Sequence, residues 1–291
     1  MAYIEKKTIK GREYYYLTEA KRVGKKFKKT RKYLGTEIPK DLAHLKKRTR
    51  KIAKKLTKKE AELINRIKNN YTAKYRINKT LWKTERYRFV DFIYNTNAIE
   101  GNTLTRDETD DVLRGKGKIP KRKERDAKEA ENMKECIDFL FDYPGDIDES
   151  MILRLHAIQH KDTFHEAGQF RKVNVRVGNY ICPDWKEVPA LISKFLAWYA
   201  DAKRTLHPFE LAALVHLKFV RIHPFRDGNG RVSRLLMNFI LLKNNYPLLN
   251  IFNDEKMLYY LMLQKYDFDR KERPYLRYLF EVFLKQYSEY I

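Results

Sequence analysis

Apolar residues recur at every third or fourth position through most of the chain beyond Thr84. This is the spacing of one face of an α-helix, and Met133, Ile137, Leu140 and Phe141 are an example. The pattern predicts a mainly α body. Helices are expected over residues 127–141, 151–160, 188–202, 208–222, 231–244, 254–266 and 274–290, with one more that opens near Phe89.

The N-terminal residues follow a different pattern. Residues 3–9 and 14–18 are rich in tyrosine, isoleucine and threonine, and turn signals follow them at Lys10-Gly11 and at Val23-Gly24-Lys25. Short β-favouring runs separated by such turns predict a small antiparallel meander, which we expect to end at Gly35.

A basic segment connects this meander to the helical body. From Leu42 to about Lys83 the chain is rich in lysine and arginine and contains no proline or glycine between them, which favours helix. The predicted organisation is a basic β-hairpin or meander at 1–40, a basic helical connector at 41–84 and a helical body at 85–291.

The net charge of +24 is concentrated in the first third of the chain. Residues 1–90 hold 30 Lys and Arg against 8 Asp and Glu, whereas residues 91–291 hold 32 against 30. Aromatic residues at 14–16 and at Phe27 lie among the lysines, and this composition can hold phosphates and stack bases. Residues 1–90 are therefore a candidate nucleic-acid-binding region of a regulator, and the alternative is a solvated, lysine-rich surface.

Other features narrow the class of protein. No apolar run approaches the roughly 18 residues of a membrane span, and the first residues lack an apolar signal core. Cys136 and Cys182 are too few for a disulfide framework, so a cytoplasmic protein is expected. His156 and His160 have the spacing of a metal pair, but no third ligand follows at a usable distance.

The densest group of chemically active residues runs from His223 to Arg234. Two glycines and an asparagine precede a helix there, which directs backbone N–H groups and the helix dipole toward one point and makes an anion-binding loop. Asp227 can hold a hard cation that bridges phosphates, and His223 is suited to take a proton from a hydroxyl. Arg231 and Arg234 lie three apart and project on nearby faces. The pattern predicts phosphate chemistry, and the alternative is a structural helix–loop–helix.

This segment resembles the signature of the Fic family, H-x-F-x-[D/E]-G-N-G-R-x-x-R. All eight constrained positions match, namely His223, Phe225, Asp227, Gly228, Asn229, Gly230, Arg231 and Arg234. The resemblance covers about residues 85–285. It implies a Fic-type helical bundle with a short β-hairpin flap, and a protein adenylyltransferase that transfers AMP from ATP to a hydroxyl of a target protein or of itself, with Mg²⁺.

The resemblance also implies a role for each matched residue. His223 would deprotonate the acceptor Tyr, Ser or Thr, Asp227 would hold Mg²⁺, and Phe225 would pack the loop into the core. The loop glycines and Asn229 would cradle the α- and β-phosphates, and the two arginines would contact the phosphate chain. The implied nucleotide contacts in this segment are Arg226, Asp227, Gly228, Asn229, Gly230, Arg231 and Arg234.

Two further segments match the family. Residues 172–180 alternate and then turn, which predicts a short hairpin, and the family has a flap over the active site at this point. A target segment would add to the flap as a strand, and the alternative is an ordinary surface hairpin. Relatives carry an aromatic pair beside the adenine where this chain has Tyr259 and Tyr260, which could instead face the core. Relatives often place an asparagine seven residues later, where this chain has Asp267, so the chain lacks the family's residue for that base contact. The expected flap residues are Val177, Gly178, Asn179 and Tyr180.

An upstream segment resembles the family's inhibitory motif, [S/T]-x-x-x-E-[G/N], with Thr96, Glu100 and Gly101 in register. A glutamate at a helix end, followed by a C-cap glycine, directs its carboxylate away from its own helix. A bidentate pair with Arg234 would occupy the donors that the γ-phosphate of ATP needs. The resemblance implies autoinhibition through Glu100, and the alternative is a solvated C-cap residue.

The resemblance leaves several properties open. In some relatives the same glutamate positions a water that removes AMP, so deAMPylation is an added hypothesis. Other Fic enzymes transfer phosphocholine, UMP or phosphate. The kinase-like branch departs from Asn-Gly-Arg-x-x-Arg, which this chain keeps, so AMP transfer is favoured. Family members often pair through the catalytic domain, which implies a homodimer by analogy.

Overall fold

The computed structural model describes residues 2–9, 12–23, 26–35, 56–116, 120–178 and 180–291. These residues form two compact units. The first contains the described part of residues 1–52 together with Val175–Ile181, and the second contains the described part of Ala53–Asn174 together with Cys182–Ile291.

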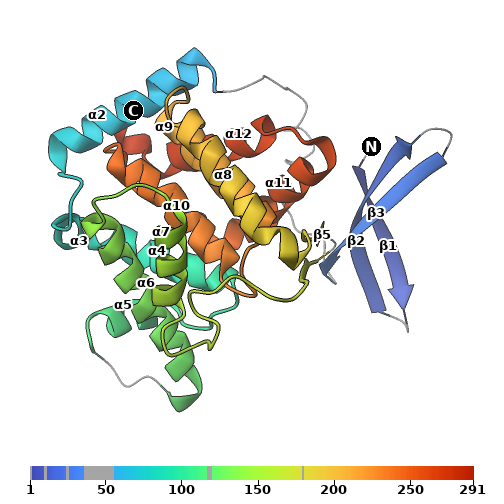
Figure 1. Cartoon of the computed structure of the whole chain (residues 1–291), viewed down its shortest axis with the longest axis horizontal. Coiled ribbons are helices and arrows are strands. Elements are labelled where there is room, and N and C mark those ends of the chain that lie inside the picture. Colours follow the sequence, from blue (N-terminus) through green and yellow to red (C-terminus); the bar gives the residue numbers. More distant parts are fainter. Residues whose placement is uncertain (1, 10–11, 24–25, 36–55, 117–119, 179) are drawn as a thin grey trace. The chain divides into compact units, whose positions relative to one another are not determined.

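The first unit contains an antiparallel sheet, which confirms the predicted meander (Figure 1). Its strands are β1 (Ala2–Ile9), β2 (Arg12–Val23) and β3 (Lys26–Gly35), in the order β1-β2-β3. Tyr3 pairs with Thr18, and Tyr16 pairs with Tyr33 beyond a register shift at Tyr15 and Tyr16. The turns predicted at Lys10-Gly11 and Gly24-Lys25 lie outside the described residues.

The same unit contains a second, two-stranded sheet. Strand β4 (Arg176–Val177) is antiparallel to β5 (Tyr180–Ile181), with Val177 paired to Tyr180. Gly178 has φ of +57°, and its carbonyl accepts a hydrogen bond of 2.8 Å from Arg176 Nε. The predicted hairpin is therefore present, while Asn179 lies outside the described residues.

The second unit is helical, as the apolar spacing predicts. Its long helices between residues 86 and 291 lie within a few residues of the expected boundaries, and the expected bounds of α8 and α9 are met at both ends. The helices are α2 (Lys58–Lys74), α3 (Leu81–Thr84), α4 (Arg86–Ile99), α5 (Arg106–Leu113), α6 (Glu124–Asp142), α7 (Glu149–Gln159), α8 (Val188–Ala202), α9 (Pro208–Ile222), α10 (Asn229–Lys243), α11 (Lys256–Asp269) and α12 (Arg273–Gln286).

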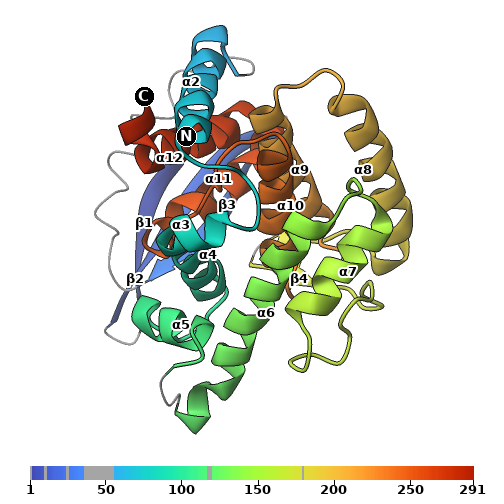
Figure 2. The same cartoon turned by 90° about the vertical axis from the view of Figure 1, so that its left-hand side faces the viewer.

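The core of this unit is built around α9 and α10, which pack against each other and are buried along most of their lengths. Helices α8 and α12 pack on α9, and α4, α6 and α7 pack on α10. Figures 1 and 2 show α10 inside the unit with α6 beside it. Because the two central helices are consecutive in the chain, the short segment that joins them is held by the core at both ends.

The helix predicted from 42 to 83 is confirmed over most of its described part, but it is interrupted by a break. Helix α2 ends at Lys74, and α3 begins only at Leu81. Between them the side chain of Asn78 accepts hydrogen bonds from the backbone N–H of Thr80 at 2.9 Å and from its hydroxyl at 2.6 Å. Such local bonds give the backbone an alternative to helix. The part of the prediction that covers residues 42–55 lies outside the described residues.

The lengths of the helices show whether any of them could span a membrane. Among the described residues, no helix combines the length and the apolar character needed to cross a bilayer.

Candidate active site

The loop between α9 and α10 begins and ends in left-handed backbone conformations. His223 caps α9 with φ of 53° and ψ of 57°, and Gly228 caps the start of α10 with φ of +80°. A Cβ at Gly228 would overlap the side chains of Gln159 and His160. Left-handed conformations at residues other than glycine are uncommon and cluster at functional sites, so His223 is held there by its surroundings.

The loop is closed by Asn229 and anchored by Phe225. The Asn229 amide accepts the backbone N–H of Phe225 at 2.9 Å and donates to its carbonyl at 2.8 Å. The Phe225 ring is fully buried, as expected, and stacks on the ring of His156 with centroids 3.7 Å apart. The side chain of Asn229 is thus used inside the loop, while its backbone lies in the first turn of α10, where N–H groups have no helical partner.

His156 of α7 connects the loop to the rest of the fold. Its Nε2–H donates to the carbonyl of Asp227 at 3.1 Å, and its Nδ1 accepts the N–H of Gly168 at 2.8 Å. Burial lowers the pKa of His156 to about 4, so the ring is neutral near pH 7. Sequence reasoning missed this role, since the spacing of His156 and His160 drew attention only to metal binding.

His223 has the geometry of a general base. Its Nδ1 lies 3.3 Å from the carbonyl of Val220. A carbonyl can only accept, so Nδ1 carries the proton and Nε2 keeps its lone pair. Burial lowers the pKa of His223 to about 4, and the nearby Arg171 cation contributes in the same direction. The imidazole is therefore already neutral near pH 7, in the form that can take a proton.

Arg171 holds the backbone around His223. It is buried, and its guanidinium donates to the carbonyls of His223 at 2.8 Å, Val173 at 2.8 Å and Pro183 at 2.7 Å. Its own N–H donates to the carbonyl of Pro224 at 2.9 Å. Sequence reasoning missed this residue because a single arginine between two elements carries no pattern.

Asp227 presents a carboxylate at the start of α10. Its Oδ1 accepts the N–H of Gly228 at 2.6 Å, and its Oδ2 lies 3.4 Å from Arg231 Nη2. Burial works against ionisation, but Arg231 and the Gly228 N–H outweigh it and lower the pKa of Asp227. The side chain remains 47% exposed, so it can take another ligand.

The residues around Asp227 fit a divalent cation that arrives with a nucleotide. Among the residues that the structure describes, no group of three or more His, Cys, Asp or Glu side chains could hold a metal. Mg²⁺ is commonly bound through one or two carboxylates, with phosphates and waters completing its octahedron. A half-exposed carboxylate beside an anion-binding helix end meets that requirement.

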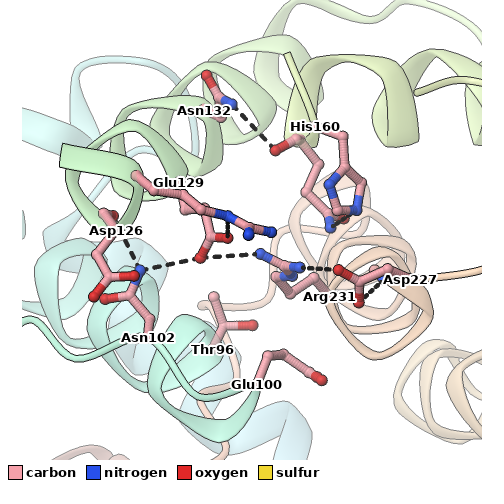
Figure 3. A network of polar contacts seen from close by, with 12 residues as sticks. Thr96, Glu100, Asn102, Asp126, Glu129, Asn132, His160, Asp227 and Arg231 are labelled. Atoms are coloured by element: carbon pink, nitrogen blue, oxygen red, sulfur yellow. Dashed lines mark hydrogen bonds and ion pairs between the residues drawn. The ribbon is translucent and has the colours of Figure 1, made fainter. Parts of the chain in front are cut away.

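Arg231 lies between two carboxylates in the network drawn in Figure 3. It is 3% exposed, and its Nη1 is 3.5 Å from Glu129 Oε2 of α6. The same oxygen accepts a hydrogen bond of 3.1 Å from Asn102, which follows the segment with the inhibitory motif. The structure therefore joins α6, α10 and the end of α4 through Glu129, which sequence reasoning missed.

Arg234 meets Glu100, as the inhibitory motif predicts. Its Nη2 donates to Glu100 Oε1 at 2.7 Å, and burial of the guanidinium is offset by this carboxylate, which raises the pKa of Arg234. The contact is a single hydrogen bond and not the expected bidentate pair. The reason is Thr96, whose hydroxyl accepts from Nε at 2.6 Å and whose carbonyl accepts from Nη2 at 3.0 Å. Gly101 follows with φ of +102°, as a C-cap glycine.

The remaining predicted residues have distinct surroundings. Tyr259 is 1% exposed, and its hydroxyl lies between Arg234 and His216, a core position. Tyr260 is half-buried and donates to the carbonyl of Ile99 at 3.2 Å. Arg226 is exposed and lies 3.3 Å from Glu166. Strands β4 and β5 belong to the first compact unit, so the role of the flap stays a prediction.

The chain is similar in sequence to known proteins. Residues 146–241 match the sequence model of the Fic/DOC family. Two proteins named "Protein adenylyltransferase Fic" are similar to the chain, one from Drosophila melanogaster (32% identical over 244 residues) and one from Culex quinquefasciatus (30% over 239 residues). The match covers 80% of this chain in both cases, but 48% and 47% of the relatives. The chain thus spans about half the length of these relatives.

Solved structures show the same fold. Fic-1 from C. elegans (residues 134–508) matches with a TM-score of 0.70 and 26% identity, covering 80% of this chain and 71% of that one. A Fic domain containing signaling protein from Bacteroides thetaiotaomicron matches with a TM-score of 0.69 and 26% identity, covering 78% and 95%. The helical unit therefore has the Fic fold. Residues 146–241 form a Fic/DOC domain.

Proposed function

We propose that this protein is a protein adenylyltransferase that is autoinhibited through Glu100. The observation that carries the proposal is the arrangement at the end of α9. A neutral His223, whose Nε2 makes no hydrogen bond with the described residues, lies at the same loop as the Asp227 carboxylate and the N-terminal end of α10. The similarity to proteins named as Fic adenylyltransferases supports the choice of AMP as the transferred group.

The proposed reaction moves one proton and exchanges one bond to phosphorus. His223 Nε2 takes the proton of a Tyr, Ser or Thr hydroxyl as its oxygen bonds to the α-phosphorus of ATP. The bond from the α-phosphorus to the bridging oxygen breaks, and pyrophosphate leaves. Backbone N–H groups of Gly228, Asn229 and Gly230 at the start of α10 would stabilise charge on the phosphates. Arg171 keeps the histidine backbone in position during this step.

Asp227 would hold Mg²⁺ together with phosphate oxygens. When bound, the cation supplies neutralisation of the charge that develops on the leaving pyrophosphate. Arg231 keeps the Asp227 carboxylate ionised before the nucleotide arrives, since the two groups are 3.4 Å apart and the cation lowers the pKa of Asp227. Arg231, Arg234 and Arg226 are proposed to contact the phosphate chain, each after its present carboxylate partner rearranges.

Glu100 would act as a brake by occupying Arg234. Its Oε1 accepts from Nη2 at 2.7 Å, so a γ-phosphate would have to displace it to reach the same donor. The same carboxylate would have a second use if it also oriented a water molecule for the removal of AMP. Val177, Gly178 and Tyr180 are proposed to align the target segment as a flap, and Tyr260 is the more accessible member of the proposed adenine-side pair.

The test is intact-mass spectrometry of the purified chain after incubation with ATP and Mg²⁺, as wild type and as Glu100→Gly. We expect a gain of one AMP in the Glu100 variant and none in Glu100→Gly/His223→Ala. Peptide mapping would then identify the acceptor hydroxyl. Parallel incubations with UTP and CDP-choline test the other Fic chemistries. A gain of phosphate, UMP or phosphocholine in place of AMP would overturn the proposal, as would no gain with any donor in the presence of candidate targets.

Nucleic-acid binding by residues 1–90 and a homodimer remain predictions. Neither the described contacts nor the similarities above bear on them.

A further inference from the structure

Four buried side chains from four helices form one chain of hydrogen bonds that ends at Arg234. Arg234 of α10 lies 3.4 Å from the hydroxyl of Tyr259 on α11. That hydroxyl is 3.0 Å from Nε2 of His216 on α9, and His216 Nδ1 is 2.7 Å from the hydroxyl of Tyr275 on α12. Each of the four side chains is at most 1% exposed, so bulk solvent does not reach them.

The chemistry of the four groups gives the chain a direction. A guanidinium can only donate, so the Tyr259 oxygen accepts from Arg234. Tyr259 then directs its own proton to Nε2 of His216. Burial lowers the pKa of His216 well below its usual value, so the ring is neutral and carries one proton. That proton lies on Nδ1, where it is donated to Tyr275.

Tyr259 is a partner of Arg234 that does not depend on the brake. The Nη2 group shares its hydrogen bonds between Glu100 and Thr96, whereas the contact with Tyr259 is made by Nη1. When Glu100 leaves, Thr96 and Tyr259 still hold the two sides of the guanidinium. His216 and Tyr275 hold the Tyr259 hydroxyl in turn, and both are in the interior, where rotation would leave buried polar atoms unpaired.

We propose that Tyr259, His216 and Tyr275 are positioning residues that aim Arg234 at the terminal phosphate, and so set the preference of the site for a nucleoside triphosphate over a diphosphate. This inference rests on the proposed function, because it takes the γ-phosphate as the group that replaces Glu100. It assigns Tyr259 a role through its hydroxyl, distinct from the ring contact with adenine that the family resemblance implies.

The experiment compares the binding of AMPPNP and ADP by calorimetry in the Glu100→Gly background, with Mg²⁺ present. AMPPNP has the three phosphates of ATP and cannot be cleaved at its β–γ bridge. Tyr259→Phe removes the direct contact, and we expect the ratio of ADP to AMPPNP dissociation constants to fall about fivefold, the effect of one lost hydrogen bond. Tyr275→Phe removes only the hydroxyl at the far end of the hydrogen-bond chain, and we expect the same ratio of dissociation constants to fall about twofold. Any change in the adenine contact affects both ligands and cancels in the ratio.

Tyr278→Phe is the matched control. Tyr278 also lies on α12 and is buried, but its hydroxyl makes no hydrogen bond with the described residues. This variant should keep the wild-type ratio. A merely structural role would weaken both nucleotides equally in all three variants, and that outcome would overturn the proposal. Unchanged binding in Tyr259→Phe would also overturn it.

A second measurement does not depend on nucleotide binding. In ¹⁵N-labelled protein, the ring nitrogens of His216 should show a protonated Nδ1 and an unprotonated Nε2, and the Arg234 side-chain signals should shift in both Tyr259→Phe and Tyr275→Phe. The opposite tautomer of His216, or an Arg234 signal that does not shift in Tyr275→Phe, would contradict this chain of hydrogen bonds. If the Glu100→Gly protein bound neither nucleotide, the proposed function would fail, while these spectra would still decide whether the chain positions Arg234.

Discussion

The carboxylate of Glu100 lies against the backbone of Gly230, so closely that a Cβ on Gly230 would overlap Glu100 Oε1. The same oxygen accepts a hydrogen bond from Arg234. Gly230 is in the first turn of α10, where backbone N–H groups have no partner within the helix. The Glu100 carboxylate therefore fills space beside the first turn of α10 as well as binding the arginine, and a phosphate that bound there would have to displace it.

Removing Glu100 is expected to increase AMP transfer. We predict that Glu100→Gly labels at least about tenfold faster than wild type, because a charge-assisted hydrogen bond to a buried arginine is lost. Transfer from α-³²P-labelled ATP measures this. Glu135→Gln, which changes an exposed glutamate on α6, should label like wild type. Equal labelling by Glu100→Gly and wild type would remove the brake from the proposal.

Replacing Gly228 is expected to disable the loop. In Gly228→Ala the Cβ would overlap Gln159 and His160 at a φ of +80°, so we expect the free energy of unfolding to fall by about 2 kcal/mol and transfer in the Glu100→Gly background to be lost. Gly115→Ala is the control. Gly115 also has a positive φ, of +65°, but no described atom outside its neighbours in the chain lies within 4 Å of the position that a Cβ would take. Urea denaturation separates backbone strain from overlap, and equal losses in both variants would mean that overlap at Gly228 contributes nothing.

The pKa of His223 should set the acid limit of the proposed reaction. Because burial lowers that pKa to about 4, the histidine stays neutral as the pH falls through 6.5. We predict that kcat/KM of the Glu100→Gly protein, measured from pH 4.5 to 8, shows no loss near pH 6.5 and begins to fall only below pH 5. A half-maximal rate near pH 6.5 would contradict the burial of the base.

Two buried histidines should make the fold sensitive to acid. The pKa of His156 is lowered to about 4 and that of His160 to about 3, both by burial, so these groups bind fewer protons in the folded than in the unfolded chain below pH 6.5. The free energy of unfolding must therefore decrease as the pH falls, by about 2 kcal/mol for His156 alone between pH 7.5 and 5.

Urea denaturation of His156→Gln at the two pH values checks this sign and size. The variant is less stable at both, but its loss between pH 7.5 and 5 should be smaller than that of wild type by about the His156 contribution. His165→Gln, in which an exposed histidine is replaced, should follow wild type. An unchanged pH dependence in His156→Gln would show that His156 is not the titrating group.

Much of this fold could be predicted from local patterns. The bounds of α8 and α9 follow from apolar periodicity with a proline near the first residue, and the anion-binding loop follows from glycines directly ahead of a helix. The Fic motif likewise predicts the meeting of Glu100 and Arg234. These features depend on residues close in sequence or on a motif that many chains share, so no knowledge of packing is needed.

The remaining contacts of the candidate site depend on packing between segments that are distant in the sequence. Arg171 beside His223, His156 beside Asp227 and Glu129 beside Arg231 are separated by 52, 71 and about a hundred positions, and no spacing rule connects them. The break after Lys74 and the burial of Tyr259 likewise depend on which groups compete for the same backbone or core space. Buried polar groups must find partners wherever the fold brings them, and those partners are known only once the helices have packed.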